Sequence, residues 1–284
     1  MLAQTLSSFA PSAHNIQRAG IGFAAGLTTD QLMRAVPSAF AESAHDSRSA
    51  RYAYVPTIGV IEGLRAEGFI PVKAVQSRSR TEDKAGHAKH MIRFRREDQL
   101  QQAEAREVIL VNSHDGSSAY QMNAGIFRLV CSNGLAVGNE DIRQSVRHSG
   151  NVKGEIIDCA FRILDRFDTV TAEIEGMKAA TLPAPLMLAF ANAAIEARFD
   201  SDEKPVTAEQ VLRARRSADT GADAWSVFNR VQENVIKGGL RGVSIDANGR
   251  KHRRATREVA GIDQNNMLNR ALWRLAVEVA KIAA

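Results

Sequence analysis

The sequence predicts an α+β fold, in which an N-terminal β-α-β-β-β block forms an antiparallel sheet and packs with a C-terminal helical region. Short apolar and β-branched runs separated by turn residues occupy positions 51–150, whereas apolar residues recur at helical spacing from Asn151 onward. The composition agrees, because 44% apolar and 24% charged residues are close to the averages of globular proteins. A chain of 284 residues is long enough to bury a large core.

Residues 1–50 are rich in Ala, Ser and Gln, and their helical periodicity is weak except around Asp30–Phe40. We expect a partly flexible N-terminal arm with one short helix. This arm would dock on the body of the protein or on a second copy of the chain.

The block at 51–150 is expected to hold one helix among its strands. The helix runs from Thr57 through Glu67 and is closed by Gly68. A polar loop is expected at Ser77–Ala88. The strand-like segments are Tyr52–Val55, Phe69–Gln76, His90–Glu97, Val108–Asn112, Ala119–Met122 (read as a strand or a helix start) and Ile126–Cys131.

The region at 151–284 begins with an apolar stripe that predicts a helix about 25 residues long. Its members follow one another at spacings of 4, 3, 4, 3, 4 and 3: Ile156, Ala160, Ile163, Phe167, Val170, Ile174 and Met177. The stripe is typical either of a core-facing helix in a bundle or of a coiled coil, which would make the chain oligomeric. Further helices are expected at Leu186–Arg198, Thr207–Arg216 (with Thr207 and Gln210 as a capping box), Asp223–Ile236 and Asn266–Ile282.

Positive charge is concentrated in two short segments, although the formal net charge is only +5. Lys73–Arg96 holds eight Lys and Arg against two acidic residues, and Lys237–Arg257 holds seven against one, so each has a local charge of +6. The rest of the chain is therefore acidic. This asymmetry is typical of a protein that binds a polyanion, although solvated surface faces have the same pattern.

The second basic segment predicts a hairpin or loop at 237–257. Asn248–Gly249 is a two-residue turn signal, because both residues tolerate positive φ. A hairpin here would present guanidinium groups that bind phosphate. We predict as nucleic-acid-binding residues of this segment Arg241, Arg250, Lys251, Arg253, Arg254 and Arg257. The alternative is a disordered, solvated loop.

The first basic segment combines cations on predicted strands with cations in the polar loop. We predict as nucleic-acid-binding residues of this segment Lys73, Arg78, Arg80, Arg93 and Arg95. Phe94 and Tyr52 or Tyr54 would add stacking surfaces for single-stranded nucleic acid if they were exposed. Aromatic residues on strands more often belong to the core.

No cofactor, small-molecule substrate or metal is indicated. The histidines His87, His90, His114 and His148 lack the spacing of a zinc site and are accompanied by no acidic cluster, so a metal-dependent nuclease is only an alternative. The glycines of 238–242 are followed by no helix, which argues against a nucleotide-binding loop. An enzyme is therefore not favoured.

A cytoplasmic protein is expected. The chain has two cysteines, Cys131 and Cys159, which make no disulfide framework. The N-terminus lacks the pattern of a signal peptide, and no apolar run is long enough for a membrane span.

Several motifs occur in an order that is similar to a known family. They are 128–135 (RLVCSNGL), Arg147-His148, 228–234 (FNRVQEN), Gly238-Gly239 and 268–273 (LNRALW). Together they resemble the phage/plasmid-like family catalogued as domain of unknown function 932, from about Ala50 to the end. The resemblance implies a setting in mobile genetic elements but no established activity, and it draws attention to Asn133, Arg147 and His148 as motif residues of unknown role.

The order of elements is also loosely similar to the Rad52-like single-strand annealing folds, an analogy of architecture alone. We therefore expect a non-catalytic nucleic-acid-binding protein of phages or plasmids, acting in DNA recombination, annealing or replication. The alternative is a protein-interaction module that acts on a host defence or regulatory complex through the same basic segments.

Overall fold

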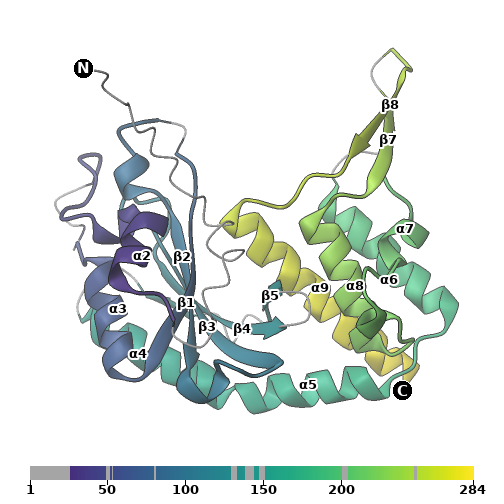
Figure 1. Ribbon diagram of the computed structural model, residues 1–284, viewed down its shortest axis with the longest axis horizontal. Helices are drawn as coiled ribbons and strands as arrows, with labels where there is room; N and C mark the ends of the chain where they lie inside the picture. The colour runs from purple at the N-terminus through teal and green to yellow at the C-terminus, as the bar shows by residue number, and fades with distance from the viewer. Residues whose placement is uncertain are drawn as a thin grey trace, which may run out of the picture. The chain divides into compact units, whose positions relative to one another are not determined.

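The computed structural model shows an α+β protein with an antiparallel sheet in the N-terminal half and helices in the C-terminal half (Figure 1). The residues that the structure describes are 26–48, 52, 54–79, 81–128, 133–137, 144–146, 151–199, 204–245 and 248–284. The chain divides into two compact units that interleave along the sequence. The first comprises Met1–Gln102, Leu110–Tyr120 and Val146–Ile157, and the second comprises Ala103–Ile109, Gln121–Ser145 and Asp158–Ala284.

The elements of the first unit are α2 (Thr29–Ala35), η1 (Pro37–Phe40), α3 (Thr57–Ala66), β1 (Phe69–Gln76), η2 (Ala85–His87), β2 (His90–Arg96) and η3 (Glu97–Gln99), where η marks a 3₁₀ helix. Elements with residues in both units are β3 (Glu104–Asn112), β4 (Tyr120–Arg128), β6 (Gln144–Val146) and α4 (Val152–Asp165). The second unit adds β5 (Asn133–Ala136), α5 (Phe167–Ala179), α6 (Ala184–Arg198), α7 (Ala208–Leu212), η6 (Ser217–Asp219), α8 (Ala224–Lys237), β7 (Arg241–Ile245), β8 (Lys251–Ala255) and α9 (Ile262–Ala283).

The larger sheet has the strand order β1-β2-β3-β4-β5, and β6 pairs with β4. Strands β1 and β2 are antiparallel, with Phe69 opposite Arg96 and Gln76 opposite His90, and the register shifts between Pro71 and Lys73. Proline has no N–H for the ladder, so it is tolerated on an edge strand such as β1. The carbonyl of Pro71 instead accepts a hydrogen bond from the Leu27 N–H at 2.6 Å, which attaches the segment before α2 to the edge of the sheet.

Part of the expected N-terminal arm therefore belongs to the first unit. Helix α2 is capped by Thr28, whose side chain accepts a hydrogen bond from the Gln31 N–H. Leu32, Val36 and Ala39 are completely buried. The structure describes no residue before Gly26.

The strand expected at Tyr52–Val55 is not formed, because Tyr52, Tyr54 and Val55 have no strand structure. Tyrosine hydroxyls form the hydrogen bonds of this segment in place of a neighbouring strand. The Tyr54 hydroxyl donates to the Ala41 carbonyl, and the Tyr120 hydroxyl donates to the Val55 carbonyl at 3.0 Å. The segment leads directly into α3, which follows Pro56.

The segment expected at Ala119–Met122 and the first part of the segment expected at Ile126–Cys131 are joined in one strand, β4, and residues 129–131 lie outside the described residues. Gly125 of β4 pairs with Ala136 on β5, so the strand continues between the two segments, and side chains on both of its faces are buried.

The apolar stripe lies on two helices, α4 and α5, which are separated at Arg166. All seven members of the stripe are at most 6% exposed. The core-facing alternative is therefore confirmed, and the stripe offers no free face for a coiled coil with a second copy.

Helices α5, α6, α7, α8 and α9 pack against one another in the second unit. The rings of Trp225, Phe228 and Trp273 lie 5.6 to 6.1 Å apart between centroids and form the aromatic centre of this core. The capping box predicted at Thr207 and Gln210 is confirmed, although α7 ends at Leu212. No helix among the described residues has the length and apolar character of a membrane span.

Candidate functional site

Within the segment predicted as a hairpin or loop at 237–257, the structure forms a two-stranded ribbon, β7–β8. In its register Arg241 lies opposite Ala255, Val243 opposite Arg253 and Ile245 opposite Lys251. Gly249 has φ +76°. The last pair, Ile245 with Lys251, leaves five residues between the strands, so the two-residue turn predicted at Asn248–Gly249 is wrong. Figure 1 shows the hairpin extending away from the helices of the second unit.

The hairpin presents a cationic face to solvent. Because side chains alternate along a strand, residues that face each other across the ribbon lie on the same face. Arg241, Val243, Lys251 and Arg253 share one face and are exposed, and Val243 is 45% exposed. No acidic side chain in the described part of the chain forms an ion pair with Arg241, Lys251 or Arg253.

The outer edge of β7 is held through its backbone groups. The Val243 N–H donates to the Pro205 carbonyl at 3.0 Å, and the Gln210 side chain donates to the Arg241 carbonyl at 3.0 Å. A Cβ on Gly242 would lie 2.2 Å from the Pro205 carbonyl oxygen, so only glycine permits this approach. The base of the ribbon is therefore packed against the second unit rather than loosely attached.

The link between α8 and the hairpin is also defined. Gly238 and Gly239 have φ of +63° and +79°, so the chain turns sharply after α8. The Gly239 N–H then donates to the Thr256 carbonyl and the Thr256 N–H donates to the Leu240 carbonyl, both at 2.8 Å. These bonds close the ribbon at the point where it leaves the helix.

Two arginines fasten the end of α8 below this turn. Arg215 Nε donates to Asn234 Oδ1 at 2.6 Å, and its guanidinium also donates to the Gly238 carbonyl. Arg216 forms an ion pair with Glu233, whose side chain is 3% exposed and also lies 3.3 Å from Lys237. Burial of the Glu233 carboxyl raises its pKa, but the hydrogen bond from Arg216 and the charge of Lys237 outweigh this and lower the pKa.

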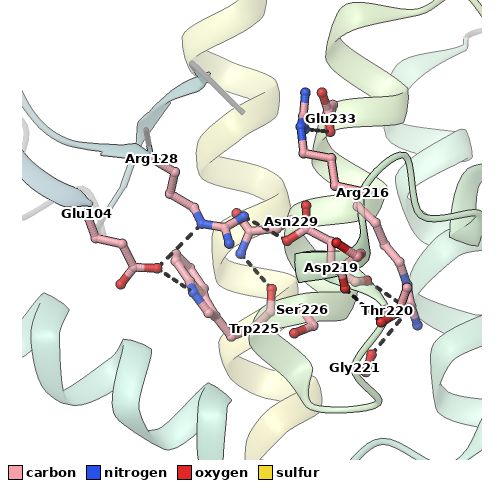
Figure 2. Close-up of polar contacts among 12 residues, drawn as sticks. Glu104, Arg128, Arg216, Asp219, Thr220, Gly221, Trp225, Ser226, Asn229 and Glu233 are labelled. Atoms are coloured by element: carbon pink, nitrogen blue, oxygen red, sulfur yellow. Dashed lines mark hydrogen bonds and ion pairs between the residues drawn. The ribbon is translucent and has the colours of Figure 1, made fainter. Parts of the chain in front are cut away.

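A second polar network lies deeper in the second unit (Figure 2). Arg128 Nη1 lies 3.0 Å from Asp219 Oδ1, and Arg128 Nε lies 3.4 Å from Glu104 Oε1. Trp225 Nε1 donates to the same Glu104 oxygen at 2.9 Å. Because Arg128 is 8% exposed and Asp219 2%, this network joins β3, β4, η6 and α8 internally and has little surface for a ligand.

The first unit holds a buried polar cluster around the Thr57 hydroxyl. Its oxygen lies 2.9 Å from His114 Nε2, 3.0 Å from His90 Nε2, 3.1 Å from Asn112 Nδ2 and 3.2 Å from the Tyr120 hydroxyl. All five side chains are completely buried. Burial lowers the pKa of His90 from 6.5 to about 4, so this histidine is neutral.

His90 and His114 are engaged in hydrogen bonds within this cluster. No group of three or more His, Cys, Asp and Glu side chains that could hold a metal ion occurs among the described residues. His90 and His114 instead hydrogen-bond to Thr57, and His90 also bonds to Ser38 at 2.8 Å. The cluster holds α3 and the sheet together through polar side chains.

The predicted nucleic-acid-binding residues are placed unequally. On or beside the hairpin, the exposed side chains are Arg241, Arg250, Lys251, Arg253 and Arg257. Arg254 lies on β8 and opposite Gly242, but its side chain is outside the description. In the first segment Arg78 is exposed and Lys73 partly exposed, whereas Arg93 and Arg95 are each 2% exposed and are not available to a polyanion in this structure.

The remaining predicted residues give less information. Asn133 begins β5 and pairs with Arg128 of β4. Arg80, Arg147 and His148 lie outside the described residues. Phe94 is completely buried, so it is not a stacking surface for bases.

Sequence reasoning missed three features. Arg128 and the polar run Asn229–Asn234 are named as parts of motifs, yet nothing local to them predicts that they are buried in networks. The signal that was available is the run itself, because five of its six residues are polar and only Val231 is apolar. Polar residues so close together in a helix lie on more than one of its faces, including the face that packs on the core. Val243 was also missed, as an apolar residue in a segment dominated by cations.

Comparisons with known proteins place these features in a family context. The family model described as "Domain of unknown function (DUF932)" matches residues 44–273. Two Escherichia coli K12 proteins, UPF0380 protein YafZ and UPF0380 protein YfjQ, are each 46% identical over 250 residues, which cover 88% of this chain and 90% of the relative. No solved structure matches the chain.

Proposed function

The chain belongs to the DUF932 family, whose name assigns no activity, and we propose that it is a nucleic-acid-binding protein that contacts the phosphate backbone through the β7–β8 hairpin. The proposal is one of binding rather than catalysis.

The observation that carries the proposal is the exposed face of Arg241, Lys251 and Arg253. Two well-defined cations of the second unit are paired with buried acids, Arg128 with Asp219 and Arg216 with Glu233, and such cations are not available to a polyanion. The three hairpin cations have no such neighbour among the described residues, yet the ribbon is held at its base by Pro205 and Gln210. Arginine side chains on an ordered ribbon suit the bidentate binding of phosphate.

The first basic segment has a smaller part in the proposal. Arg78 and Lys73 remain candidates for phosphate contact, because their side chains reach solvent wholly or partly. We leave Arg93 and Arg95 out of the interface because they are buried.

We further propose a setting in the cytoplasm and in mobile genetic elements such as phages, prophages and plasmids. The order of the family motifs supports the setting, and the buried free thiol of Cys159 suits a reducing compartment. There, DNA binding would assist recombination, annealing or replication. We also propose that several copies of the protein assemble on one nucleic acid. The buried apolar stripe of α4 and α5 is not the surface that would join them.

The test is fluorescence anisotropy with labelled DNA at two salt concentrations. For about four phosphate contacts, a fourfold rise in salt should weaken binding about a hundredfold. The variant Arg241→Glu, Lys251→Glu, Arg253→Glu should bind at least about tenfold more weakly than the wild type on every DNA sequence.

A matched control changes three exposed arginines elsewhere: Arg34→Glu, Arg166→Glu, Arg274→Glu. This variant has the same net charge as the hairpin variant, so it separates the position of the charge from its total. If both variants lose binding equally, or if the wild type shows no salt-sensitive binding at micromolar protein, the proposal is wrong. Retention of an acidic host protein after nuclease treatment, without binding to DNA, would favour the protein-interaction alternative instead.

A further inference from the structure

One face of the β7–β8 hairpin carries exposed side chains that can meet a ligand. The face of Gly242 is turned toward Pro205 at the base, whereas the opposite face carries Arg241, Val243, Lys251 and Arg253 in solvent. A ligand therefore meets a narrow ribbon with cations along its length and an apolar residue in the middle.

Resting on the nucleic-acid binding proposed above, we infer that the nucleic acid is duplex DNA and that the exposed face of β7–β8 lies in its major groove.

The dimensions of the ribbon fit this groove. Two paired strands lie about 4.8 Å apart, and five residues of strand extend about 17 Å. The major groove of B-form DNA is about 12 Å wide and admits a two-stranded ribbon, whereas the minor groove is about 6 Å wide. The length of β7 and β8 corresponds to about five base pairs.

The composition of the hairpin disfavours single strands. Proteins that bind single-stranded DNA stack its bases on aromatic side chains, and the segment 237–257 contains no Phe, Tyr or Trp. The two tryptophans and Tyr120 are at most 4% exposed, in the cores of their units. Duplex RNA is also disfavoured, because its major groove is deep and too narrow for side chains to read.

Val243 adds an argument that phosphate contact alone does not supply. It lies opposite Arg253, on the same strand as Arg241, and is 45% exposed between cations. Contacts to the backbone would need only the charges. In the major groove an apolar side chain at this place can pack on the methyl group of thymine, while the flanking arginines reach phosphates or guanine.

The experiment compares three ligands of one sequence that includes thymine and guanine: duplex DNA, its single strand and the corresponding duplex RNA. The full chain should bind duplex DNA at least about tenfold more tightly than the other two. Dimethyl sulfate footprinting at saturating protein should show protection of guanine N7, in the major groove, but not of adenine N3, in the minor groove.

Val243→Ser tests the centre of the ribbon without changing its charge. Duplex binding should weaken about fivefold, while single-strand binding should not change. The matched control is Met267→Ser, which alters an exposed apolar residue on α9 and should leave both unchanged.

The outcomes separate the two proposals. Salt-sensitive binding that is equal for all three ligands, or tighter for the single strand, overturns the inference and leaves the nucleic-acid-binding function standing. Protection of adenine N3 alone also overturns it. Absence of binding to every ligand overturns both.

Discussion

Arg128 and Asp219 form a buried ion pair, with Arg128 Nη1 3.0 Å from Asp219 Oδ1 and the two side chains 9% and 2% exposed. The two residues are far apart in the sequence, on β4 and η6, so the pair connects the sheet strand to the segment that precedes α8. Removal of Asp219 would leave the buried Nη1 of Arg128 without its acceptor, while Glu104 still contacts Nε.

Asp219→Ala should therefore lower the free energy of unfolding by about 3 kcal/mol. Urea unfolding followed by tryptophan fluorescence measures it, since Trp225 lies in the same network. The control is Asp168→Ala, which removes a carboxylate that is 93% exposed and 3.9 Å from Arg106, and whose loss should not be measurable. Equal losses for both variants would contradict the structural role of the pair.

The lowered pKa of His90 implies that the free energy of unfolding depends on pH. Its pKa is about 4 in the folded protein and near 6.5 when unfolded, so the unfolded chain takes up the proton first as the pH falls. The stability that neutral His90 contributes is fully present above about pH 6.5 and is lost progressively toward pH 4, by about 3 kcal/mol in total.

His90→Gln should remove this part of the pH dependence. Urea unfolding across this pH range should show the stability difference between wild type and variant shrinking as the pH falls. Ser38→Ala is the control, because it deletes the hydroxyl 2.8 Å from His90 Nδ1 but keeps the histidine. Ser38→Ala should lower the free energy of unfolding and retain its pH dependence. If the free energy of unfolding of the wild type and that of His90→Gln changed in parallel with pH, His90 would not be a buried neutral histidine.

Gly242→Ala tests how the hairpin is attached. The new methyl group would meet the Pro205 carbonyl oxygen at 2.2 Å, so β7 must shift and its bond from the Val243 N–H is weakened. We expect a loss of about 1–3 kcal/mol in the free energy of unfolding. Faster cleavage by trypsin within 241–257 should accompany it, because the ribbon is rich in Lys and Arg.

Gly86→Ala provides the comparison, since a Cβ at Gly86 meets nothing within 4 Å. It should leave both thermal stability and trypsin cleavage unchanged. Slow cleavage of the hairpin in Gly242→Ala would show that the contact with Pro205 does not hold the ribbon.

Much of the local structure was predictable. The capping box of Thr207 and Gln210 depends on residues a few positions apart, where backbone preferences act directly. The strand expected at Tyr52–Val55 was not predicted correctly, because contacts with residues far away in the sequence decide the conformation of this segment. The Val55 carbonyl, for example, accepts a hydrogen bond from the Tyr120 hydroxyl and not from a neighbouring strand.

The candidate site likewise has features that the sequence predicts and features that only the folded structure shows. The concentration of cations at 237–257 follows from the sequence alone, because charge is counted along the chain. The tertiary structure decided which cations reach solvent: Arg93 and Arg95 are buried, whereas Arg241, Lys251 and Arg253 are exposed. It also decided that Arg128 and the polar residues of α8 are internal. Burial of a charged side chain is tolerated only where a partner from elsewhere in the chain compensates it, and such partners are brought together only by folding.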